Sequence, residues 1–139
     1  MLRLEMNFNL YGNDIDEDIN PIEAGLDWVV KFNKKKFIGK NALLQIKGNL
    51  IYISVCLEMK EKSIPRKGYL VFFKNKKIGQ VTSGTMSLSK KKGIAKAIIK
   101  KEYSKNGNNI LVDIRGKKKK AVIVASPFYK SGSLLENND

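Results

Sequence analysis

The residue types available in this chain limit its chemistry to a few classes. The 139 residues include no histidine and a single cysteine, Cys56. A zinc site, a Ser-His-Asp triad and a Cys-His pair are therefore excluded within the chain. Any reaction must rest on carboxylates, lysine, arginine, tyrosine or a bound group, and no metal is expected.

Three of these side chains fall on one face of the first eleven residues. Arg3, Glu5 and Tyr11 occupy odd positions, whereas apolar residues occupy the even positions from 2 to 10. This alternation predicts a strand over residues 2–11 with one buried face. A guanidinium fork suits a carboxylate ligand. The alternative is an exposed ion pair of Arg3 with Glu5 or a nearby aspartate, worth at most about 1 kcal/mol.

An acidic cluster follows this segment, at Asp14, Asp16, Glu17 and Asp18. It resembles a metal site only superficially, because it lacks the glycine and the bidentate glutamate of a calcium loop at the right spacing. We therefore expect a solvated loop here.

The charge of the chain is large and unevenly placed. The net charge is +14, although residues 1–30 contain seven acidic residues against Arg3 alone. Only three of the 27 basic residues are arginines, and no aromatic residues interleave with the lysines. These features argue against a nucleic-acid partner. They favour an acidic protein partner instead, because opposite charges steer the encounter.

The patterning predicts a mainly β protein. Asn20, Pro21 and Glu23 are typical of a helix start, residues 28–32 favour a short strand, and a second short helix is expected over residues 40–47. Six further strands are predicted, separated by Gly, Pro and Asn turns: residues 51–58, 68–73, 77–83, 93–100, 110–115 and 120–126. Six short strands in succession indicate a sandwich or a small barrel.

The chain divides near residue 48. Residues 1–48 cannot bury a core of their own, residues 49–130 can close one, and residues 131–139 are expected to form a flexible tail. We therefore expect the chain to be a piece of something larger. It has no apolar run long enough to cross a membrane and no secretory signal, and the lone Cys56 cannot form an internal disulfide. These features favour a cytoplasmic protein.

Seven motifs carry a family resemblance in register along the chain: Arg3–Glu5, Leu10–Glu17, Asn20–Trp28, Phe37–Leu43, Ile78–Gly84, Ile114–Lys117 and Pro127–Tyr129. Together they resemble the second half of the glycine cleavage system T-proteins, the aminomethyltransferases. The resemblance implies a C-terminal six-stranded antiparallel β-barrel. The barrel would be preceded by a short α+β segment, residues 1–48, that belongs to the folate-binding region.

The resemblance also implies an activity. The family transfers a one-carbon unit from the aminomethyl-lipoyl group of H-protein to tetrahydrofolate, as co-substrate, and releases ammonia. The family's catalytic aspartate lies in the N-terminal half, which this chain does not contain, so the isolated chain is expected to be inactive. Lipoylated H-protein and the missing N-terminal half are the implied partners. The alternative is a stand-alone basic β-barrel that acts as a binding or interaction module without catalysis.

No catalytic residue is assigned, but four substrate or folate contacts are. Arg3 matches the family's substrate-contacting arginine, and Tyr129 matches a terminal segment that reaches back to the folate site. Tyr11 is placed to hydrogen-bond folate through its hydroxyl, and Glu5 is expected to orient Arg3. Trp28 is interpreted as core or inter-domain packing.

Overall fold

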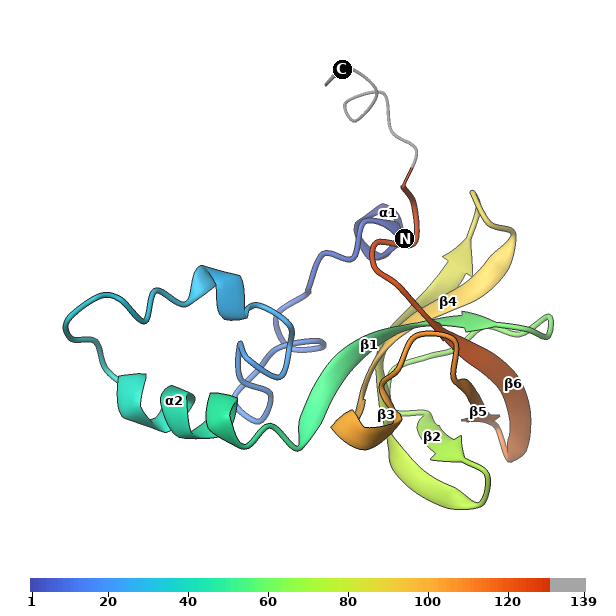
Figure 1. The fold of residues 1–139 in the computed structure, drawn as a ribbon. Coiled ribbons are helices and arrows are strands. Elements are labelled where there is room, and N and C mark those ends of the chain that lie inside the picture. The colour runs from blue at the N-terminus through green and yellow to red at the C-terminus, as the bar shows by residue number, and fades with distance from the viewer. Residues whose placement is uncertain (131–139) are drawn as a thin grey trace.

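A six-stranded barrel forms the C-terminal part of the computed structural model, which describes residues 1–130. All neighbouring strands are antiparallel, and the closed order is β1-β4-β3-β2-β5-β6. The strands are β1 (Tyr52–Met59), β2 (Leu70–Phe73), β3 (Lys76–Ser87), β4 (Lys92–Lys100), β5 (Asn109–Ile114) and β6 (Lys117–Val124). The predicted barrel is thus confirmed, with strand bounds within a few residues of those expected (Figure 1).

Apolar side chains of the six strands fill the barrel interior. Leu57 on β1 lies opposite Ala95 on β4, so that a large side chain faces a small one across the ladder. All twelve buried residues of this cluster are apolar. At Gly79 there is no room for a side chain, because a β-carbon there would lie 2.0 Å from the backbone oxygen of Ile98 on β4. Only glycine fits that position.

A second apolar cluster lies outside the barrel wall. It joins Leu4, Cys56, Ile94 and Phe128, all nearly fully buried. The cluster seats helix α1 (Leu2–Glu5) and the segment after β6 against strands β1 and β4. This cluster is one of the contacts that attach the N-terminal residues to the barrel (Figure 1).

The predicted strand over residues 2–11 is wrong. The chain forms the single turn of α1 and then continues without regular structure. A strand needs a free sheet edge, and the closed barrel offers none. In the helical turn the consecutive residues Leu4 and Glu5 are both buried. In a strand with one exposed face they would point to opposite sides, and only one of them would be buried.

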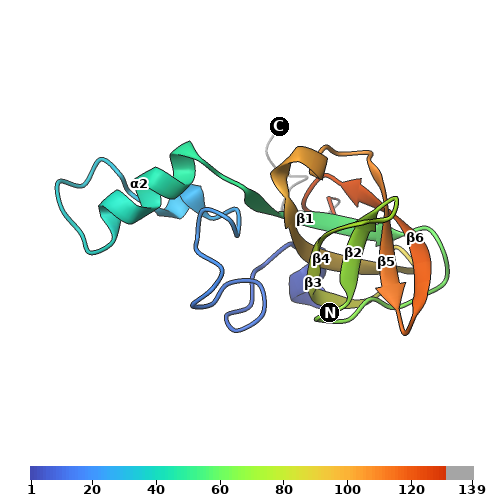
Figure 2. The ribbon, with the colours of Figure 1, turned by 90° about the horizontal axis from the view of Figure 1, so that it is seen from below.

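The rest of the N-terminal region is irregular apart from two short helices. A 3₁₀ turn, η1 (Asp27–Val29), replaces the predicted strand over residues 28–32, and α2 (Lys40–Gly48) confirms the predicted second helix. Figures 1 and 2 show α2 and the loop before it extending away from the barrel. A further 3₁₀ turn, η2 (Lys101–Tyr103), follows β4.

The predicted helix start at residue 20 is present as a reciprocal cap on an isolated turn. Asn20 Oδ1 accepts hydrogen bonds from the backbone N–H groups of Ile22 and Glu23, at 3.0 and 3.1 Å. Glu23 Oε2 in turn accepts from the Asn20 N–H at 3.4 Å. Gly25, at φ +76°, then redirects the chain, as a left-handed residue does at a helix end.

The remaining sequence interpretations concern the packing of Trp28 and the C-terminal tail. Trp28 is 71% exposed, so it packs into no core within residues 1–130. The expected flexible tail, residues 131–139, lies outside the described residues. Among the helices of the described part, none combines the length and apolarity needed to span a membrane.

Candidate functional site

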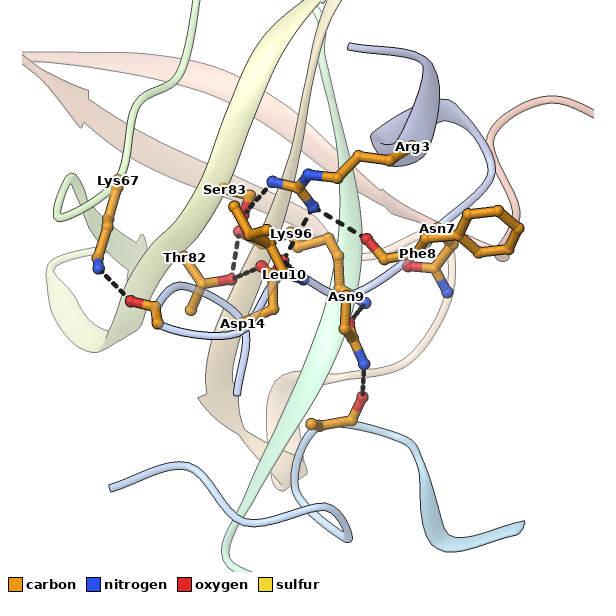
Figure 3. Close-up of polar contacts among 12 residues, drawn as sticks. Arg3, Asn7, Phe8, Asn9, Leu10, Asp14, Lys67, Thr82, Ser83 and Lys96 are labelled. Carbon is orange, nitrogen blue, oxygen red and sulfur yellow. Dashed lines mark hydrogen bonds and ion pairs between the residues drawn. The ribbon is translucent and has the colours of Figure 1, made fainter. Parts of the chain in front are cut away.

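The candidate site lies where residues 3–14 cross the outer face of β3. Arg3 Nη1 donates to Asp14 Oδ2 at 3.1 Å and to the Phe8 backbone oxygen at 2.9 Å, and Arg3 Nη2 donates to Ser83 Oγ at 3.1 Å (Figure 3). The Arg3 side chain is 31% exposed, whereas the Asp14 side chain is fully buried. The guanidinium is therefore held in place yet still reaches solvent on one side.

Asp14 is the centre of this arrangement. Its Oδ1 accepts from Thr82 Oγ1 at 2.6 Å, and its Oδ2 accepts from the Leu10 N–H at 3.0 Å as well as from Arg3. A buried carboxylate needs such partners, because removing a charge from water is costly. The expectation that the acidic cluster is a solvated loop is thus wrong for Asp14. Asp16 instead caps its own loop by accepting from two backbone N–H groups.

A tight turn over residues 10–14 positions Asp14. The N–H groups of Asn13 and Asp14 both donate to the Leu10 oxygen, and Gly12 adopts φ +86°, a left-handed conformation that favours glycine. Lys67 Nζ donates to the Gly12 oxygen at 2.6 Å and ties the turn to the barrel (Figure 3). The turn thus returns the chain so that a carboxylate lies beside Arg3.

Glu5 does not contact Arg3. It is 6% exposed and accepts from Ser87 Oγ at 2.5 Å, from Ser89 Oγ at 3.2 Å and from the Ser89 N–H at 3.4 Å. These hydrogen bonds, that of Ser87 foremost, lower the pKa of Glu5 against the opposing effect of burial. The prediction that Glu5 orients Arg3 is wrong, because residues two apart on a helix point in different directions.

The two predicted tyrosines lie at different places. Tyr11 is 73% exposed at the tip of the turn, and its backbone bridges Ile15. Tyr129 lies beside α1, where its N–H donates to the Glu5 oxygen at 3.1 Å. Neither hydroxyl has a hydrogen-bond partner among residues 1–130. The structure therefore brings Arg3, Glu5 and Tyr129 together around α1 and leaves Tyr11 further along the same segment.

Sequence reasoning missed the cavity next to this site. A hollow of about 660 Å³ lies between residues 6–9, residues 24–28 and strands β1 and β4. Its wall includes Lys96, only 2% exposed, and Cys56, only 4% exposed. Lys96 Nζ donates to Asn9 Oδ1, and Cys56 Sγ donates to Asn7 Oδ1 at 3.4 Å. The one available signal was a lysine inside the otherwise apolar run from residue 93 to 99.

Burial shifts the protonation of both cavity groups toward the neutral form. Desolvation raises the pKa of the Cys56 thiol to about 11. Desolvation also lowers the pKa of the Lys96 amine, and the charge of Asp14 opposes this effect. Within residues 1–130 no cluster of three or more metal-ligating side chains occurs.

Comparison with known proteins places the chain in a family. The glycine cleavage T-protein C-terminal barrel domain matches residues 54–130, and the GCVT N-terminal domain matches residues 1–34. The chain belongs to the glycine cleavage T-protein family. The resemblance of its motifs to this family is thereby confirmed, and the barrel described above is the C-terminal barrel domain of a T-protein.

Individual T-proteins agree with this assignment. The chain is 49% identical to an aminomethyltransferase of Bacteroides fragilis and 51% identical to one of Caldanaerobacter subterraneus, each over 93% of this chain. A crystal structure of glycine cleavage system aminomethyltransferase T from Bartonella henselae superposes with a TM-score of 0.85 at 31% identity and covers 92% of this chain. The chain spans 37% of the Bacteroides and Bartonella proteins and 35% of the Caldanaerobacter protein.

Proposed function

We propose that this chain acts as the C-terminal part of an aminomethyltransferase of the glycine cleavage system. The complete enzyme would transfer a one-carbon unit from aminomethyl-lipoyl H-protein to tetrahydrofolate and release ammonia. The observation that carries the proposal is the 49% identity to an aminomethyltransferase over 93% of the chain, spanning both the barrel and the segment before it. Tetrahydrofolate enters as a co-substrate, and no metal is invoked.

In this proposal Arg3 binds the carboxylate-bearing co-substrate. Its guanidinium is oriented by the buried Asp14 and by Ser83, and it retains a solvent-facing side. Three of its five N–H groups are bound by Phe8, Asp14 and Ser83, so the co-substrate carboxylate would accept from those that remain, without further ordering of the side chain. Tyr129 and Tyr11 offer hydroxyls without an internal partner among residues 1–130. Glu5 acts indirectly by anchoring α1 to the end of β3.

The N-terminal region supports a partnership with the preceding part of a T-protein. Phe8, Trp28 and Ile38 are 62%, 71% and 104% exposed, and in this proposal the preceding part of the T-protein covers them. The chain spans little more than a third of its relatives, so the catalytic aspartate that the family supplies would come from that preceding part. The basic charge of residues 31–139 favours acidic H-protein as the second partner.

The test is reconstitution. The chain is mixed with the preceding portion of the Bacteroides fragilis aminomethyltransferase, and formation of methylenetetrahydrofolate and ammonia is measured with aminomethyl-H-protein. We expect product only when both polypeptides are present. A pair that associates and folds but stays inert would overturn the proposal and favour the stand-alone basic barrel, an interaction module without catalysis.

Arg3 is tested in the same reconstituted pair. Arg3→Ala should weaken tetrahydrofolate binding by about 1–3 kcal/mol, the range for losing a charged hydrogen-bond partner. Lys77→Ala, which removes an exposed positive charge from β3, is the matched control and should leave binding unchanged. Equal affinities for the parent and Arg3→Ala proteins would refute the assignment of Arg3.

A further inference from the structure

Two nucleophilic side chains face the same cavity from paired strands. Cys56 on β1 and Lys96 on β4 are directly opposed residues in the antiparallel ladder. Directly opposed side chains project from the same face of a sheet, with β-carbons about 4.5–5.5 Å apart. Both residues line the 660 Å³ cavity beside the candidate site. The ladder therefore places a thiol and an amine side by side.

The setting of Lys96 differs from that of a structural lysine. Its side chain is almost fully buried, and within residues 1–130 no carboxylate lies within 4.0 Å of its ammonium nitrogen. Its hydrogen-bond partner is the neutral amide of Asn9. Desolvation favours the neutral form of a buried lysine that lacks a directly paired carboxylate, and a neutral amine is a nucleophile toward carbonyl carbon.

The thiol of Cys56 is buried in the same surroundings as the amine of Lys96. Burial raises the pKa of the Cys56 thiol to about 11 and lowers the pKa of the Lys96 amine, so desolvation shifts both groups toward their neutral forms. Asn7 and Asn9 hold the thiol and the amine from the same short segment of the chain. Because only 4% of Cys56 and 2% of Lys96 are exposed, a ligand that reaches both groups must be small.

We propose that Cys56 and Lys96 form a covalent site for a small aldehyde. The Lys96 nitrogen adds to the carbonyl carbon to give a carbinolamine, which loses water to form an imine. The Cys56 sulfur then adds to the imine carbon, and the thiol proton passes to the nitrogen. One aldehyde is taken up and one water is released, with no oxidant or reductant. The product is a sulfur–carbon–nitrogen bridge across β1 and β4. This site is independent of the proposed function.

Formaldehyde is the probe for the bridge. The intact chain is treated near neutral pH with one equivalent of formaldehyde and mapped by peptide mass spectrometry. We expect a cross-linked species that contains Cys56 and Lys96 and is heavier by one carbon atom. A second portion is treated with formaldehyde and cyanoborohydride, which reduces imines to methylamines. There we expect Lys96 to be methylated ahead of the exposed lysines.

Three variants separate the steps. Cys56→Ser should lose the bridge but keep the methylation of Lys96, and Lys96→Arg should lose both. Lys100→Arg removes the lysine that lies opposite Tyr52 on the same strands and should change neither. Modification of exposed lysines with Lys96 untouched would overturn the site, and so would methylation of Lys96 without any bridge. Both decisive results are read from the parent chain, so they hold even where a variant fails to fold.

Discussion

The pairing of Arg3 with Asp14 predicts a measurable coupling between two residues eleven positions apart. Asp14 is fully buried and accepts three hydrogen bonds, of which only that from Arg3 carries a positive charge. Breaking a buried ion pair costs about 3–5 kcal/mol when one charge is left behind. Arg3 is 31% exposed, so water compensates part of this loss. We therefore expect Arg3→Ala to lower the free energy of unfolding by about 2 kcal/mol.

The coupling itself is obtained from a double-mutant cycle. Asp14→Asn keeps the shape of the side chain but removes its charge, and should cost about 1–2 kcal/mol through weaker hydrogen bonds to Thr82 and Leu10. In the double variant the residual charge is gone, so the combined loss should fall short of the sum by about 1–2 kcal/mol. Urea unfolding followed by circular dichroism gives the four free energies.

A local readout covers the case in which the N-terminal segment detaches before the barrel unfolds. The Leu10 N–H donates directly to Asp14, so its hydrogen exchange reports opening of the turn. Both single variants should accelerate that exchange. A coupling of zero in the unfolding cycle, together with unchanged exchange at Leu10, would refute the reasoning. The ion pair of Arg3 with Asp14 would then contribute nothing to the stability of the segment.

Three further changes have defined outcomes. Glu5→Gln should make the free energy of unfolding depend less on pH below 4.5. Hydrogen bonds from Ser87 and Ser89 lower the pKa of Glu5 below 4.5 in the folded state. The parent protein therefore loses stability as the pH falls through that pKa, and the variant should not. Thermal melts at a series of pH values measure this. The parent protein should gain stability as the pH rises toward 10.5, because the pKa of Lys96 in the folded state lies below 10.5. Between the folded-state pKa and 10.5 the unfolded chain binds more protons than the folded one. Lys96→Met should abolish this gain. The same melts test it, and an equal gain in both proteins would contradict it. Gly79→Ala should cost about 3 kcal/mol in urea unfolding, since its β-carbon would lie 2.0 Å from a backbone oxygen of β4, whereas Gly48→Ala has open space and should be near neutral.

The barrel was predictable because its strands carry their own signal. The strands are short runs rich in apolar and β-branched residues, and polar turn residues separate them. The structure reproduces all six. The order in which they pair was not readable from the chain, since β1 joins β4 and β6 and neither neighbour is adjacent in sequence.

The N-terminal prediction failed for a physical reason. Alternation over residues 2–11 describes a strand only if a sheet edge is free to receive it, and a closed barrel has none. The local pattern was therefore overridden by tertiary structure. Residues 27–29 form a 3₁₀ turn in place of the strand predicted over residues 28–32, and Trp28 is exposed.

The candidate site was predictable in part. Arg3 was found by its motif, but its partner Asp14 was interpreted as one of several solvated acids, because spacing alone does not reveal which acid a turn will bury. The burial of Lys96 depends on residues 6–9 lying over β4, a contact that no local pattern encodes.

The strand order of the barrel has a kinetic consequence. β1 is made before every strand with which it pairs, and its second neighbour, β6, is the last strand within residues 1–130. During synthesis one edge of β1 can pair once β4 has been made, but its other edge stays unpaired until β6 has left the ribosome. Such distant pairings slow folding, because a long loop must close before any contact compensates for its lost entropy. We expect this domain to fold in milliseconds to seconds, with the β1–β6 seam closing last.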